Sequence, residues 1–109
     1  PAEGNERQQW YLALGRDPKR MAATSATRLV KAAGSRAEVP PTLTVFRGNA
    51  NRQRIEKGYA TALRAAGTPT VLVDATSLSH ADVNTRIGAP GDRVMTPPLV
   101  RFLTTCFAP

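Results

Sequence analysis

The sequence predicts an α/β fold built around one βαβ unit, and three consecutive segments carry this prediction. Residues 42–46 are mostly β-branched or aromatic, and a turn-rich loop follows them at residues 47–51. From residue 52 onward, apolar side chains recur at helical spacing until Gly67, which stands where a helix C-cap glycine belongs. Residues 68–75 form a second β-rich run. Two strands joined by a helix of about four turns lie parallel, with a right-handed crossover.

Helical patterns flank this unit on both sides. The first covers residues 6–14, and the dipeptide Asp17-Pro18 then starts a second helix that continues to residue 30. A polar connection at residues 34–41 leads into the first strand. After the second strand the pattern predicts three further segments. These are a short helix from residue 80 to 87, a turn at residues 88–92, and a final amphipathic helix that opens at Thr96-Pro97-Pro98.

Length and composition indicate one domain or part of one. The chain has 109 residues, of which 41% are hydrophobic and 21% are charged, so disorder and fibrous repeats are not favoured. No apolar stretch approaches the roughly 20 residues that span a bilayer, so we expect no membrane span and a soluble protein. The chain starts without Met, which suggests that it derives from something longer.

The predicted sheet is too small to stand alone. Parallel strands are normally buried on both faces, and two of them leave apolar surface and strand edges uncovered. We therefore expect residues 1–109 to be a single partial domain. Its partner would be the missing N-terminal part of the same fold, or another chain.

The net charge of +7 raises the possibility of a nucleic-acid partner, because clustered Lys and Arg bind phosphates. The basic residues are scattered, however, and the densest group comprises Arg47, Arg52, Arg54 and Lys57. A solvated basic surface is therefore the favoured interpretation, and nucleic-acid binding is an alternative.

Cys106 is the single cysteine, so no internal disulfide can form; we expect a buried structural thiol, or else a bond to another chain.

His80, the single histidine, is the candidate general base. It follows the second β-rich run and a short polar loop, and it precedes a helical segment. That order places an imidazole at the carboxyl edge of the sheet, where open α/β sheets carry their chemistry. A structural histidine is the alternative.

Other catalytic classes lack their motifs. One histidine, one cysteine and dispersed carboxylates provide no spacing for a metal, and no glycine-rich phosphate loop follows either strand, so we expect no cofactor. No serine lies in a nucleophile elbow, so each is expected to be a cap, turn or loop residue; the four are Ser25, Ser35, Ser77 and Ser79.

Several segments together resemble the C-terminal third of an α/β-hydrolase of the esterase and lipase type. Four stretches carry the resemblance: Leu14-Gly15-Arg16-Asp17-Pro18-Lys19-Arg20-Met21-Ala22-Ala23, Val39-Pro40-Pro41-Thr42-Leu43, Tyr59-Ala60-Thr61-Ala62-Leu63-Arg64-Ala65-Ala66-Gly67 and Leu78-Ser79-His80. They are similar, in this order, to the family's Asp-Pro segment, its approach to the penultimate strand, the helix between its last two strands, and its catalytic histidine. Asp82-Val83-Asn84 continues in the style of several bacterial esterases.

The resemblance implies a catalytic role for His80 and places Asn51 in the position of the triad acid. The family's acid follows the penultimate strand in a loop that often reads Gly-x-x-Asp, and here the loop reads Gly48-Asn49-Ala50-Asn51. An amide cannot stabilise the imidazolium that forms during proton transfer. Asp74 and Asp82 are poor substitutes, because Asp74 lies within the last strand and Asp82 is two residues from His80.

The resemblance also implies the reaction, hydrolysis of a small-molecule carboxylic ester through a serine acyl-enzyme. The sequence contains no Gly-x-Ser-x-Gly elbow and no His-Gly-Gly oxyanion segment, so we expect the isolated chain to be inactive. One alternative is a catalytically inactive relative that serves as a binding or assembly module. Another is a basic nucleic-acid-binding domain.

Overall fold

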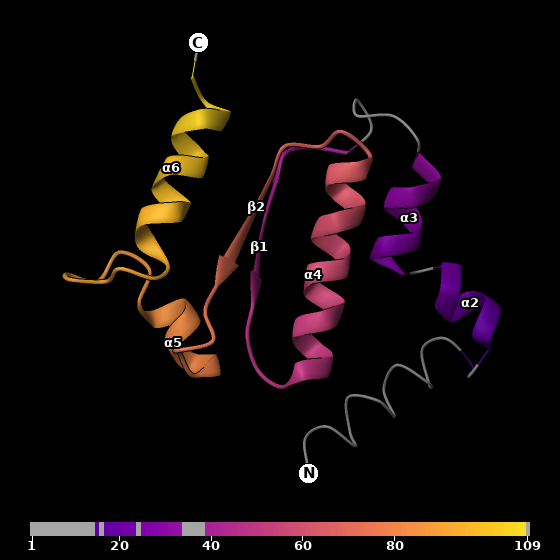
Figure 1. Ribbon diagram of the computed structural model, residues 1–109, viewed down its shortest axis with the longest axis horizontal. Helices are drawn as coiled ribbons and strands as arrows, with labels where there is room; N and C mark the ends of the chain where they lie inside the picture. The colour runs from indigo at the N-terminus through magenta and orange to yellow at the C-terminus, as the bar shows by residue number, and fades with distance from the viewer. Residues whose placement is uncertain (1–14, 16, 24, 34–38, 109) are drawn as a thin grey trace.

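The computed structural model describes residues 15, 17–23, 25–33 and 39–108, and the chain has a mixed α/β fold (Figure 1). The predicted βαβ unit is confirmed: strand β1 (Thr42–Phe46), helix α4 (Ala50–Ala65) and strand β2 (Thr70–Asp74) follow one another. The two strands pair in parallel, with Thr42 opposite Thr70 and Phe46 opposite Asp74. Their carboxyl ends therefore meet at one edge of the sheet.

Local chemistry fixes both ends of α4. Asn49 is the N-cap residue, and its side-chain oxygen accepts a hydrogen bond from the backbone N–H of Arg52 at 2.9 Å. The helix begins at Ala50, two residues earlier than the sequence pattern predicts, so Asn51 lies in its first turn rather than in a loop. Gly67 has a φ of +78° just after the helix, as the C-cap prediction requires.

Strand β2 starts two residues later than predicted. The backbone N–H of Thr68 donates to the carbonyl of Leu63 at 3.0 Å, so this residue still completes the end of α4. Pro69 has no N–H to offer a neighbouring strand, and its carbonyl accepts from Thr42 at 3.0 Å. Thr68 therefore still belongs to the end of α4, and the Pro69 carbonyl already bonds to β1 immediately before the ladder starts at Thr70.

The N-terminal helical pattern contains a break that the sequence pattern does not predict. The structure has two helices, α2 (Pro18–Ala23) and α3 (Ala26–Ala33). Ser25 stands before the second, and its Oγ accepts from the backbone N–H of Arg28 at 3.5 Å, as an N-cap side chain does. The helix predicted at residues 6–14 lies outside the described residues, as does most of the connection at residues 34–41.

Helices lie on both sides of the strands (Figure 1). Thr44 and Phe46 turn toward α4, where Thr44 bonds to Glu56 and Lys57 lies over the Phe46 ring. The alternate strand residues face the other way and pack around Val73, Ala75 and Met95, and they are Leu43, Val45 and Val71. A second small core joins Val30 of α3 to Ala62 and Leu63 of α4.

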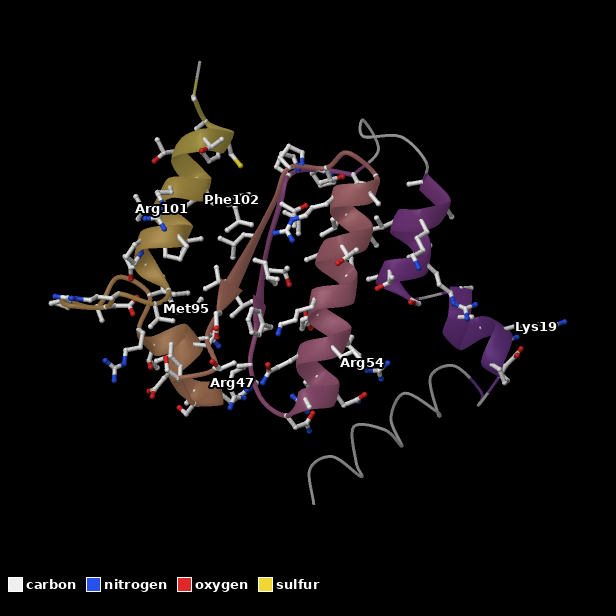
Figure 2. All side chains as sticks on the ribbon, viewed as in Figure 1. Lys19, Arg47, Arg54, Met95, Arg101 and Phe102 are labelled. Atoms are coloured by element: carbon white, nitrogen blue, oxygen red, sulfur yellow. The ribbon has the colours of Figure 1, made fainter. Side chains whose placement is uncertain are left out.

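The C-terminal elements follow the predicted order. Helix α5 (His80–Thr85) ends two residues before the predicted position, with Arg86 as its C-cap. Helix α6 (Thr96–Cys106) opens at the predicted Thr-Pro-Pro, and Phe102 points from it toward the sheet (Figure 2). Cys106 is exposed, so the prediction of a buried thiol is wrong: the residue is the last of α6, a helix without buried side chains.

The chain is less compact than an ordinary domain of its length. Its radius of gyration is 16.0 Å, against about 13 Å expected for a compact domain of this size. Leu63 is the one large side chain of the described part that is fully buried. No helix in the described ranges has the length and apolar character needed to cross a membrane.

Candidate active site

His80 is the first residue of α5 and is exposed at the carboxyl end of the sheet. Ser79 caps the helix, and its Oγ accepts from the backbone N–H of Asp82 at 3.2 Å. The loop before the histidine is tied to the end of β1, because Arg47 Nε donates to the carbonyl of Leu78 at 3.0 Å. The segment that leaves β2 thus turns back over β1.

The carboxylate of Asp74 forms two hydrogen bonds within this loop. Its Oδ1 accepts from the hydroxyl of Thr76 at 2.6 Å and from the Thr76 backbone N–H at 3.0 Å. These bonds, helped by the charge of Lys57, lower the pKa of Asp74 and keep it ionised. This carboxylate is therefore engaged with the end of the strand, and it does not line the hollow that contains His80.

The imidazole lines an open hollow of about 260 Å³, here named the His80 hollow. The other lining residues come from the end of β1 and from the first two turns of α4, and they are Val45, Arg47, Arg52, Ile55 and Glu56. A histidine that follows β2 therefore reaches across the carboxyl end of β1 to meet side chains of α4. Secondary structure predicted from the sequence places His80 at this edge but does not indicate these neighbours.

Asn51 does not line the His80 hollow. It is exposed in the first turn of α4, where its Oδ1 accepts from Arg54 Nη2 at 2.7 Å. Figure 2 shows Arg54 on the side of α4 that faces away from α5 and Arg47 beside α5. The structure therefore brings His80 together with Arg47, and it leaves Asn51 with Arg54.

Glu56 is the carboxylate that sequence reasoning missed. It is half-buried in the His80 hollow, and its Oε2 accepts from Thr44 Oγ1 at 3.0 Å. No motif marks this residue. The available signal is its place four residues after Arg52, which puts both on one face of α4.

Two other chemical possibilities find no support near His80. The described ranges contain no group of three or more His, Cys, Asp or Glu side chains that could hold a metal ion.

A larger groove, of about 490 Å³, lies at the opposite end of the sheet, between the starts of both strands and α6. Pro69, Val71 and Phe102 line it, and the titratable side chains there are Arg101 and Cys106. The smaller hollow is the better candidate site because it holds both a base and a carboxylate.

Comparison with protein-family models, with curated proteins and with solved structures gives no match. A functional assignment therefore depends on the arrangement of residues at the carboxyl end of the two strands.

Proposed function

We propose that this chain is the C-terminal part of an α/β-hydrolase of the esterase type, in which His80 is the catalytic base. The observation that carries the proposal is the position of the imidazole. His80 follows the second of two parallel strands and crosses the carboxyl end of the first, where it lies in an open hollow. A base in this position can face a nucleophile delivered next to β1.

In the proposed reaction a serine hydroxyl attacks the carbonyl carbon of an ester. His80 takes the hydroxyl proton as the new C–O bond forms, and it returns that proton to the alcohol as the old C–O bond breaks. Water then attacks the acyl-enzyme with the same imidazole as base, which releases the acid and the free serine. The serine and the oxyanion donors belong to a segment outside these 109 residues, because the sequence has no elbow motif.

Glu56 is assigned the place of the triad acid. It is the one carboxylate among the described residues that lines the His80 hollow, and Thr44 holds it beside β1. A carboxylate can stabilise the imidazolium that forms in the transition state, which the amide of Asn51 cannot. The contact of Asn51 with Arg54 also supports this choice.

The test uses the natural protein that contains this chain, with p-nitrophenyl butyrate as the ester. We expect His80→Ala to lower kcat about 10⁴-fold or more, as loss of a triad member does. Glu56→Gln should lower kcat with little change in KM. Asn84→Ala, an exposed position on the same helix, is the control and should retain activity. Unchanged turnover in His80→Ala would refute the proposal.

A second function, a binding or assembly module without catalysis, is favoured by one observation. An amide stands in the family's acid position, and Arg54 occupies its oxygen. The variants His80→Ala and Glu56→Gln discriminate between the two functions. Ester turnover that both substitutions lower favours the esterase, whereas a natural protein without ester turnover favours the module.

A further inference from the structure

The His80 hollow has an excess of positive charge. Its lining contains two guanidinium groups, from Arg47 and Arg52, together with the imidazole and the single carboxylate of Glu56. The surrounding segment, residues 47–57, carries four cationic side chains and one acidic side chain. An anion entering this hollow would therefore meet a favourable field.

Arg47 is held in position. It is half-buried, and its Nε donates to the Leu78 carbonyl at 3.0 Å, so the guanidinium is fixed beside the loop that carries His80. Its terminal nitrogens form no hydrogen bond or ion pair with another residue of the described part. A fixed guanidinium with donors to spare binds an oxyanion at a smaller entropic cost than a mobile one.

The carboxylate of Glu56 already has a hydrogen-bond partner. Its Oε2 accepts from Thr44, and Arg52 lies one turn away on the same face of α4. Lys57, over the Phe46 ring at 4.6 Å, adds a further cation at this end of β1. Val45 and Ile55 supply apolar walls. A complementary ligand therefore combines a short hydrocarbon body with a planar oxyanion, the shape that a guanidinium fork binds.

We propose that the His80 hollow binds a carboxylate, and that the ester hydrolysed at this site carries that carboxylate on a short aliphatic chain. The second clause rests on the proposed function, because it assigns the anion to the substrate. Arg47 and Arg52 would hold the carboxylate, and this would orient the ester beside His80. The substrate class is thus the monoester of a small dicarboxylic acid.

Binding can be measured without turnover in the natural protein that contains this chain, where the imidazole resonances assigned to His80 by comparison with His80→Ala report on the hollow. This protein is titrated with succinate at constant pH and ionic strength, and the His80 resonances are followed by NMR. We expect a saturable shift with succinate and none with succinamide, its neutral counterpart. Arg52→Gln should weaken succinate binding about tenfold, the loss of one charge-assisted contact.

Arg101→Gln is the matched control. It removes the same charge from the groove at the opposite end of the sheet and should leave succinate binding unchanged. Arg47→Lys keeps the positive charge but loses the planar guanidinium. It should weaken succinate binding even if the loop that carries His80 keeps its conformation. A circular dichroism spectrum identical to that of the parent chain confirms that each variant is folded.

Three outcomes would overturn the inference. They are the absence of a saturable shift, equal shifts with sodium chloride, and tighter binding of inorganic phosphate than of succinate. The esterase proposal fails separately, if His80→Ala leaves turnover intact in the natural protein. Succinate binding without His80-dependent turnover would keep the carboxylate site and remove its assignment to an ester substrate.

Discussion

Asp92 shows how much a single side chain contributes to the start of α6. Its carboxylate accepts hydrogen bonds from the hydroxyl and backbone N–H of Thr96, both at 2.6 Å, and from the backbone N–H of Val94 and Met95 at 3.0 and 3.1 Å. Pro97 and Pro98 follow, so the first turn of α6 has few N–H groups left to cap. One carboxylate therefore satisfies most donors at this end.

These bonds make α6 sensitive to acid. The Thr96 hydroxyl and the three backbone bonds lower the pKa of Asp92 to about 2, from a usual value of 3.8. Because the folded pKa lies below the unfolded one, the stabilisation is fully present above about pH 4 and is lost as the pH falls toward 2. We expect Asp92→Asn to lower the melting midpoint at pH 7. Between pH 4 and 2 the melting midpoint of this variant should fall less than that of the parent chain. Asp82→Asn, which removes a carboxylate from α5, is the control; an equal change in that variant would contradict this role for Asp92.

Site residues differ in how far sequence alone could find them. His80 could be placed at the carboxyl edge of the sheet because the β-rich run, the polar loop and the helical pattern occur in that order. Its neighbours could not be predicted, because the return of the chain over β1 depends on the bond between Arg47 and Leu78. Glu56 was missed for the same reason: only the packing of α4 against Thr44 brings it to the site.

Among the elements, α4 joins the two halves of the small interior. Ala62 and Leu63 pack against Val30 of α3, and the same helix contacts both strands. Leu63 has no exposed surface, whereas Leu103 of α6 keeps 44% of its surface exposed. The cost of truncating a leucine side chain can therefore be compared at a buried and at a half-exposed position.

Truncation of Leu63 should be the costlier of the two changes. We expect Leu63→Ala to lower the free energy of unfolding by about 3 kcal/mol, because it removes buried methyl groups and leaves a cavity. Leu103→Ala should cost less than about 1 kcal/mol, since that side chain is half in water. Urea unfolding monitored by circular dichroism measures both values. Equal losses would show that the interior around α4 is not packed as described.

Element types were predictable where the pattern is strong, whereas most boundaries were not. The β-branched run gave β1 at its observed bounds, whereas the split between α2 and α3 escaped detection because residues 17–30 show no proline or glycine between the two helices. The early start of α4 depends on the Asn49 cap, and the late start of β2 depends on the Thr68 bond to Leu63. These are side-chain and backbone contacts that a periodicity does not encode.

At the scale of the whole molecule, the sheet is small. Within the described ranges its two parallel strands leave one edge open on each side, and Leu43, Val45 and Val71 are only half-buried. Larger parallel sheets cover such surfaces with further strands and helices.

The proposed mechanism also sets the activity expected of the chain by itself. It assigns the base to His80 and the acid to Glu56, and the sequence has no serine in an elbow, so we expect no acyl-enzyme to form on this chain alone. We expect the purified 109-residue chain to hydrolyse p-nitrophenyl butyrate no faster than the chain with His80→Ala. Initial rates at matched protein concentration measure this, with light scattering to record the oligomeric state. Robust turnover that His80→Ala abolishes would mean that a nucleophile lies within these residues. Ser77 and Ser79, which precede the histidine in the same loop, would then be the first candidates.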